Sequence, residues 1–309
     1  MITTFFSKSN PFNYVLVTFL FISIFFLGSI SLPNDMFLSF AFLKKIGILT
    51  VLIATIYMAN FVTKRNGLSK DSTFTFFLVF LFLVMFPSVF ENANLVLSNF
   101  FVLLSLRRLI SLQSLIAPKE KIFDASIWIF VASLFHFWAI LFIFLVFISI
   151  IFHVSRDYRN WILPFIAFFA VAIIFVFLAL LIDKTQIELF LQSRQSDFAL
   201  PDFSPKYQNT AVFIFSIFSL LFFGIQVFTV SSKPQMLHAS YKKVMISFVI
   251  AGVIFLISNK KTDSLLVFTF MPTAVMATSF FESAQPKWLK ESVIGIIIFC
   301  SFLLFYLKI

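Results

Sequence analysis

Residues 94–154 decide the fold of this chain and read NLVLSNFFVLLSLRRLISLQSLIAPKEKIFDASIWIFVASLFHFWAILFIFLVFISIIFHV. An apolar run at residues 94–106 stops at two arginines, and a longer apolar run covers residues 127–151 with His136 inside it. A helix that spans a membrane needs about 20 predominantly apolar residues. Two apolar runs, residues 94–106 and 127–151, on either side of a short basic segment predict helices that cross a lipid bilayer and return.

The whole chain has the composition of an integral membrane protein. Apolar residues make up 61% of its 309 residues and charged residues only 12%, whereas soluble domains carry about 25% charged residues. The net charge is +10, and the lysines and arginines lie in short loops between apolar runs. This pattern follows the positive-inside rule, so it predicts orientation in a membrane and not nucleic-acid binding. The 51 phenylalanines are well tolerated against lipid, so we expect them to pack in the membrane and not to have a specific function.

The sequence predicts an all-α polytopic transmembrane bundle of about ten or eleven spans, with a cytoplasmic N-terminus. Residues 122–154 would measure roughly 50 Å as one straight helix, more than a hydrocarbon core of about 30 Å. One helix would also place Arg156 and Arg159 outside. Two short helices that meet near His136 keep both arginines inside, so the charge pattern favours a hairpin. The other apolar runs lie at residues 14–32, 46–62, 74–86, 94–106, 161–182, 211–230, 244–258, 265–281 and 292–307.

The loops between these runs differ in charge and support this orientation. Residues 107–121 are strongly basic and are expected in the cytoplasm, either as a helix along the membrane surface or as an ordinary loop. Residues 231–243, which include Lys243, are expected in another inner loop. The longest polar loop, residues 183–210, has more acids than bases and is expected outside the cytoplasm. Residues 1–309 therefore form a single integral membrane domain with no separate soluble part.

His136 is the strongest candidate for a functional residue. A titratable side chain within a membrane segment is energetically costly and is a functional candidate by default. The neighbouring Phe135, Phe137 and Trp138 would make a partly dry site that tunes the pKa of His136 for general base catalysis. The alternative is a histidine at a helix end whose hydrogen bonds go to a carbonyl or to lipid headgroups.

Two acids and two amides lie in the first two outer loops. Asp35 and Glu91 would join His136 as catalytic groups if these loops converge, and otherwise they are ordinary loop acids. Asn92 and Asn94 flank Glu91, where they would bind sugar hydroxyls or cap the next helix.

Arg107 and Arg108 are candidates for substrate binding. A pair of arginines can bind a phosphate group through two parallel hydrogen bonds, although such a pair also anchors the inner end of a membrane helix. Asp124 is expected in the first turn of the following helix, where it would complement the helix dipole. The single Cys300 and three histidines exclude a cysteine-rich or four-histidine metal centre. No cofactor and no metal ion are therefore expected.

Two resemblances rest on these residues. Residues 5–17, FFSKSNPFNYVLV, and residues 106–143 resemble a family of uncharacterised integral membrane proteins from flavobacteria and their relatives, which implies a membrane fold but no activity. Residues 107–145 are similar to a pattern in EpsG-like and Wzy-type polysaccharide polymerases. In that pattern a helix with an arginine at its inner end is followed by a basic linker and by a helix that ends A-x-x-F-H. The matching residues are Arg107 or Arg108, Ala132, Phe135 and His136.

The residues and the second resemblance favour an enzyme of the bacterial inner membrane that acts at the outer face. It would transfer glycosyl groups or polymerise polysaccharide from a polyprenyl-linked sugar, with His136 as the base. Asp35 and Glu91 would line the pocket, and residues 183–210 would act as a lid. The alternative is a non-enzymatic subunit that scaffolds an envelope or secretion complex with other envelope membrane proteins. A transporter is the third hypothesis.

Overall fold

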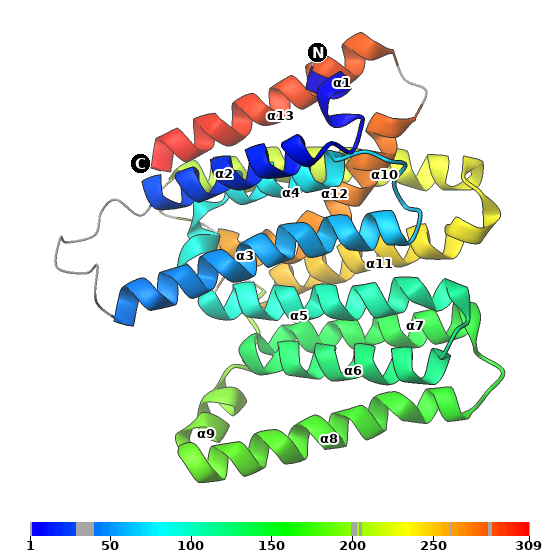
Figure 1. The fold of residues 1–309 in the computed structure, drawn as a ribbon. Coiled ribbons are helices and arrows are strands. Elements are labelled where there is room, and N and C mark those ends of the chain that lie inside the picture. The colour runs from blue at the N-terminus through cyan, green and yellow to red at the C-terminus, as the bar shows by residue number, and fades with distance from the viewer. Residues whose placement is uncertain are drawn as a thin grey trace.

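The computed structural model describes residues 2–28, 40–198, 203, 206–259, 261–283 and 286–308. These residues form thirteen α-helices and several short 3-10 helices (Figure 1). Within them the only extended pairing is an isolated bridge between Ser196 and Ser258. The all-α prediction is therefore confirmed.

The helices follow the predicted apolar runs along the chain. The α-helices are α1 (Ile2–Phe6), α2 (Pro11–Leu27), α3 (Phe40–Arg65), α4 (Phe74–Met85), α5 (Ala93–Ile110), α6 (Pro118–Phe135), α7 (Ile143–His153), α8 (Arg159–Ile182), α9 (Thr185–Gln192), α10 (Lys206–Thr229), α11 (Gln235–Ile257), α12 (Val267–Glu282) and α13 (Lys287–Lys308). The 3-10 helices are η2 (Pro87–Glu91), η3 (Ser111–Ser114), η4 (Phe137–Phe142), η5 (Val230–Ser232) and η6 (Asp263–Leu266).

Seven helical segments in the described part of the chain are long and apolar enough to cross a membrane. They are α3, α5 with η3, α8, α10 with η5, α11, η6 with α12, and α13. Shorter apolar helices, α2, α4 and η4 with α7, lie beside them. The chain is therefore a multi-pass membrane protein by the length and composition of its helices.

The hairpin predicted around His136 is present. Helix α6 ends at Phe135, and His136 has an extended backbone with φ −143° and ψ 107°, so the helix cannot continue through it. After α7 the chain returns to the start of α6, where Asp157 Oδ2 lies 3.1 Å from Lys119 Nζ. Helix α6 begins at Pro118, earlier than expected. Asp124 therefore lies in the second turn and not in the first.

Helices α4 and α12 form the centre of the bundle. Every residue of α4 is buried, and so is every residue of α12 from Val267 to Phe281. Phe270 of α12 packs with the rings of Phe82, Phe86 and Phe215, at centroid distances of 6.0, 5.6 and 5.4 Å. Helix α8 is different, because only 17% of the residues in its apolar 18-residue stretch are buried (Figure 1, lower edge). Phenylalanine therefore serves both as core and as outer, lipid-compatible surface.

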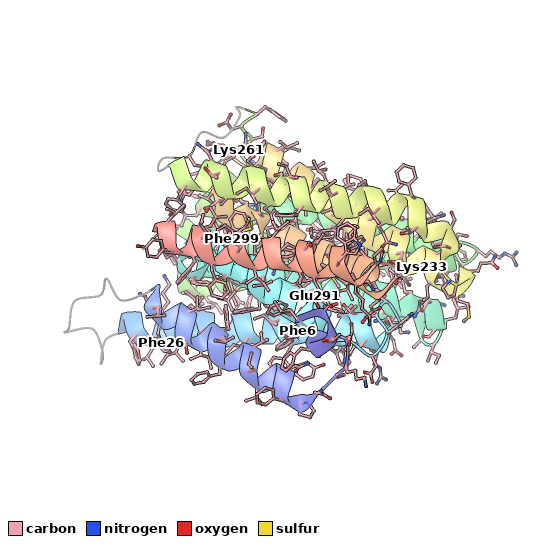
Figure 2. All side chains as sticks on the ribbon, turned by 90° about the horizontal axis from the view of Figure 1, so that it is seen from above. Phe6, Phe26, Lys233, Lys261, Glu291 and Phe299 are labelled. Carbon is pink, nitrogen blue, oxygen red and sulfur yellow. The ribbon has the colours of Figure 1, made fainter. Side chains whose placement is uncertain are left out.

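The two ends of the bundle differ in charge. We call the end where α3 stops and α4 starts the basic end, and the opposite end the His136 end. Figure 2 shows Lys233 at the basic end and Lys261 at the other. The basic residues described at the basic end are Lys8, Lys64, Arg65, Lys70, Arg107, Arg108, Lys119, Lys121, Arg156, Arg159, Lys233, Lys242, Lys243, Lys287 and Lys290. Most lysines and arginines of the chain therefore lie at one end.

Glu282 fastens the connection between α3 and α4 to the end of α12. Its carboxylate accepts hydrogen bonds from Ser69 Oγ at 2.5 Å, from the Lys70 backbone N–H at 2.9 Å and from Ser72 Oγ. Hydrogen bonds to a charged group contribute more to stability than neutral ones. The loop is thus held by one carboxylate.

We expect Glu282→Gln to lower the free energy of unfolding by about 1.5 kcal/mol, because the three donors lose a charged acceptor. Equilibrium unfolding in micelles measures this difference. Glu120→Gln is the matched control, since Glu120 is exposed at the same end of the bundle. Equal effects of the two substitutions would contradict the assigned role of Glu282.

Candidate functional site

His136 lies in the turn between α6 and η4, outside both helices. Its Nε2 lies 3.2 Å from Ser258 Oγ at the end of α11, and its ring centroid lies 5.8 Å from that of Phe268 on α12. Ser258 Oγ donates its proton to the Ile254 carbonyl at 2.7 Å. His136 Nε2–H is then the donor to Ser258, and this network assigns Nδ1 as the unprotonated nitrogen.

The surroundings of His136 favour its neutral form. Burial lowers the pKa of His136 to about 4, because the charged imidazolium loses its hydration. At pH 7 the ring is therefore neutral, with a lone pair on one nitrogen. A neutral imidazole can accept a proton, but a pKa this far below 7 makes His136 a weaker base than an ordinary histidine.

A segment from the longest polar loop packs beside His136. Trp138 Nε1 donates to the Gln195 carbonyl at 3.4 Å, and the Asp197 N–H donates to the Ile257 carbonyl at 3.1 Å. Phe190 of α9 packs on Phe137, with 5.6 Å between the ring centroids. The described part of residues 183–210 thus lies at the His136 end, and its action as a lid stays a prediction.

Glu91 and the two asparagines also lie at the His136 end, but they contact other partners. Glu91 pairs with Lys308 of α13 at 3.0 Å, and its side chain is 70% exposed. Asn92 Nδ2 donates to Ser264 Oγ at 2.9 Å, and Asn92 makes no side-chain capping bond to α5. Asn94 is exposed in the first turn of α5.

The remaining predicted acid, Asp35, lies outside the described residues, so the structure does not relate it to His136 or to Glu91. Among the described residues, no group of three or more His, Cys, Asp or Glu side chains is arranged to hold a metal ion. Besides His136 and its hydroxyl partner Ser258, this end holds the carboxyl group of Asp263, which is 3% exposed at the start of η6.

Arg107 and Arg108 lie at the basic end, far from His136. Helix α5 starts near Glu91 and is about 27 Å long for its 18 residues, and both arginines are in its last turn. Arg108 pairs with Asp124 of α6 at 2.7 Å, and the Arg107 guanidinium lies 5.0 Å from the centre of the Phe61 ring. The structure therefore does not bring the arginines and His136 to one small substrate.

Lys243 was not selected from the sequence. It was expected in an inner loop, but it lies in α11 and its residue is 0% exposed. Its Nζ donates to the Leu109 carbonyl at 2.5 Å, in the last turn of α5, where carbonyls lack the i+4 donor of a helix interior. Pro234 was the available signal, because a helix that begins directly after it places Lys243 more than two turns inside.

The comparisons with known proteins give a family and no activity. No curated protein and no solved structure matches the chain. One family model matches residues 1–309, in agreement with the resemblance to uncharacterised integral membrane proteins. The chain belongs to the family of unknown function DUF6427.

Proposed function

We propose that the protein is a glycosyl-transfer or polysaccharide-polymerising enzyme of the bacterial inner membrane, and that His136 is its general base. The observation that carries the proposal is the pairing of His136 Nε2 with Ser258 Oγ at 3.2 Å. This contact fixes the ring between α6 and α11 and leaves Nδ1 as the basic nitrogen. The polymerase-like pattern around Ala132 and His136 supports the same residue.

The charge of the bundle supports an outer-face location. Basic residues concentrate on the cytoplasmic side of membrane proteins, and most of the described ones lie at the basic end. The His136 end would then face away from the cytoplasm. Because α2 starts at the basic end, the same rule supports a cytoplasmic N-terminus.

The reaction needs one base and a good leaving group. Neutral His136 accepts the proton of an acceptor sugar hydroxyl as its oxygen bonds to the anomeric carbon of the donor sugar. The bond between that carbon and the polyprenyl diphosphate oxygen breaks, and the diphosphate leaves with the electron pair. A diphosphate leaves as a stable anion, so no acid has to protonate it. Asp35 and Glu91 remain proposed lining residues, whereas Arg107 and Arg108 have no part at this end.

The experiment is a transfer assay with the purified protein in liposomes that contain a polyprenyl-linked sugar. Mass spectrometry detects an extended saccharide on the lipid carrier. The wild type is expected to form this product, and His136→Gln is expected to form almost none. Product formation at equal rates by both proteins would refute the role of His136.

A second candidate is a non-enzymatic subunit that supports an envelope complex through contacts with other membrane proteins. The observation that favours it is that two predicted site residues form ion pairs within the chain, Glu91 with Lys308 and Arg108 with Asp124. Their charges then stabilise the bundle and do not face a substrate. A subunit of this kind would keep its cellular role in the His136→Gln variant, and the enzyme would lose it.

A further inference from the structure

A groove of about 530 Å³ lies between α2 and α3 near the basic end. Tyr57 and Phe61, two of its lining residues, are 42% and 40% exposed, so the groove opens on the outside of the bundle where lipid lies. Its volume falls within the range of about 300–1,000 Å³ found for ligand pockets. The full lining is Tyr14, Tyr57, Asn60, Phe61, Lys64 and Arg65.

Positive charge gathers at the basic end of this groove. Lys64 Nζ donates to Ser9 Oγ at 2.6 Å and lies 3.5 Å from Asp71 Oδ1, but the Asp71 side chain is 92% exposed, so this ion pair is weak. In the described part of the chain, neither Arg65 nor Arg107 forms an ion pair. Arg107 lies over the ring of Phe61, which lines the groove. The groove therefore suits an anion.

The groove also contains a buried acceptor with no partner. Asn60 is only 7% exposed, and its Nδ2 donates to the Tyr14 hydroxyl at 3.2 Å. Its Oδ1 has no hydrogen-bond partner among the described residues. A buried acceptor without a donor is energetically costly. Because Asn60 Oδ1 is covered in this structure, a hydroxyl donor on a bound molecule satisfies it only when the groove widens around Asn60.

We infer that this groove binds an anionic phospholipid whose headgroup carries hydroxyl groups, such as phosphatidylglycerol. The phosphate would meet Lys64, Arg65 and Arg107, and a headgroup hydroxyl would donate to Asn60 Oδ1. An acyl chain would lie along the exposed aromatic rings. Basic pockets between membrane helices bind anionic headgroups in this way, and tyrosines are enriched at the depth of the headgroups. The site is independent of the proposed chemistry at His136.

The preference of the groove for an anionic headgroup is tested by native mass spectrometry of the detergent-solubilised full chain. The two lipids compared are phosphatidylglycerol and phosphatidylcholine with identical acyl chains. The wild type is expected to bind phosphatidylglycerol more tightly. Arg65→Gln and Arg107→Gln are each expected to weaken this binding about fivefold, and the double variant about 30-fold. Lys242→Gln is the matched control, because Lys242 is exposed at the same end but does not line the groove.

The headgroup hydroxyl is tested with phosphatidylethanol, which has the same charge as phosphatidylglycerol but no hydroxyl. The wild type is expected to prefer phosphatidylglycerol, and Asn60→Leu is expected to lose that preference. Circular dichroism of each variant in phosphatidylcholine checks that it is folded. Equal binding of phosphatidylglycerol and phosphatidylcholine by the wild type would overturn the site. An equal loss of phosphatidylglycerol binding in Lys242→Gln would also overturn it. So would tighter binding of polyprenyl phosphate than of phosphatidylglycerol, shown by displacement at a lower concentration.

Discussion

His136→Gln is expected to lower the rate of glycosyl transfer by about 10²–10⁴-fold, the usual contribution of a positioned general base. Glutamine keeps an N–H group that can donate to Ser258 Oγ, so the contact between the ends of α6 and α11 survives. It has no nitrogen that can take up a proton at neutral pH. The initial rate of product formation in liposomes, divided by the amount of folded protein, measures the effect.

His153→Gln is the matched control for this substitution. His153 ends α7 at the basic end, where its Nδ1 lies 3.3 Å from the Ser149 carbonyl. The same chemical change at that position is expected to leave the transfer rate near that of the wild type. A large loss in both variants would assign the effect to packing. Wild-type rates in both would refute the role of His136, and absence of product from the wild type would favour the non-enzymatic subunit.

A second readout of the same variant is the dependence of stability on pH. The pKa of His136 is lowered to about 4 in the folded protein, and it is about 6.5 in an unfolded chain. Between these values the unfolded chain binds more protons, so the free energy of unfolding falls as the pH drops from about 6.5 towards 4. Above about pH 6.5 the ring is neutral in both states, and the protonation of His136 no longer lowers the free energy of unfolding. The difference between the wild type and His136→Gln, measured across this range, isolates the contribution of His136.

The sequence predicted the helices and the hairpin because both depend on span length and on the placement of charge. A stretch too long for one span and two arginines after it, Arg156 and Arg159, were enough to predict a turn near His136. The predicted first residues of the helices were less accurate. Pro118 begins α6 and Pro234 precedes α11, and in both places the helix includes charged residues that hydropathy assigns to a loop.

The candidate site was predicted less well than the fold. The expected topology already placed Arg107 and Arg108 inside and His136 outside, so one small substrate was never compatible with all three. The structure shows this separation along α5. Lys243 was missed because average hydropathy does not show whether a lysine near a helix end faces solvent or another helix. The groove between α2 and α3 depends on lateral packing of the helices, which hydropathy and charge along the sequence do not reveal.

Packing also decides what each phenylalanine contributes, and one substitution made at two positions tests this. Phe270 is 2% exposed in the first turn of α12, and Phe177 is 61% exposed on α8. Lipid tails are as apolar as a protein core, so removing a ring loses contacts and leaves a cavity only where protein surrounds that ring. The two residues have the same hydropathy, but only Phe270 is surrounded by protein.

Phe270→Ala is expected to lower the free energy of unfolding by about 3 kcal/mol, the lower end of the range for buried rings, because lipid transfer adds little. The ring of Phe270 contacts Phe82, Phe86 and Phe215, so its removal leaves these three rings facing a cavity. Phe177→Ala is expected to change it by less than about 0.5 kcal/mol. Unfolding in mixed micelles compares the two. Equal losses would mean that α8 is covered by protein, such as a partner subunit, and not by lipid.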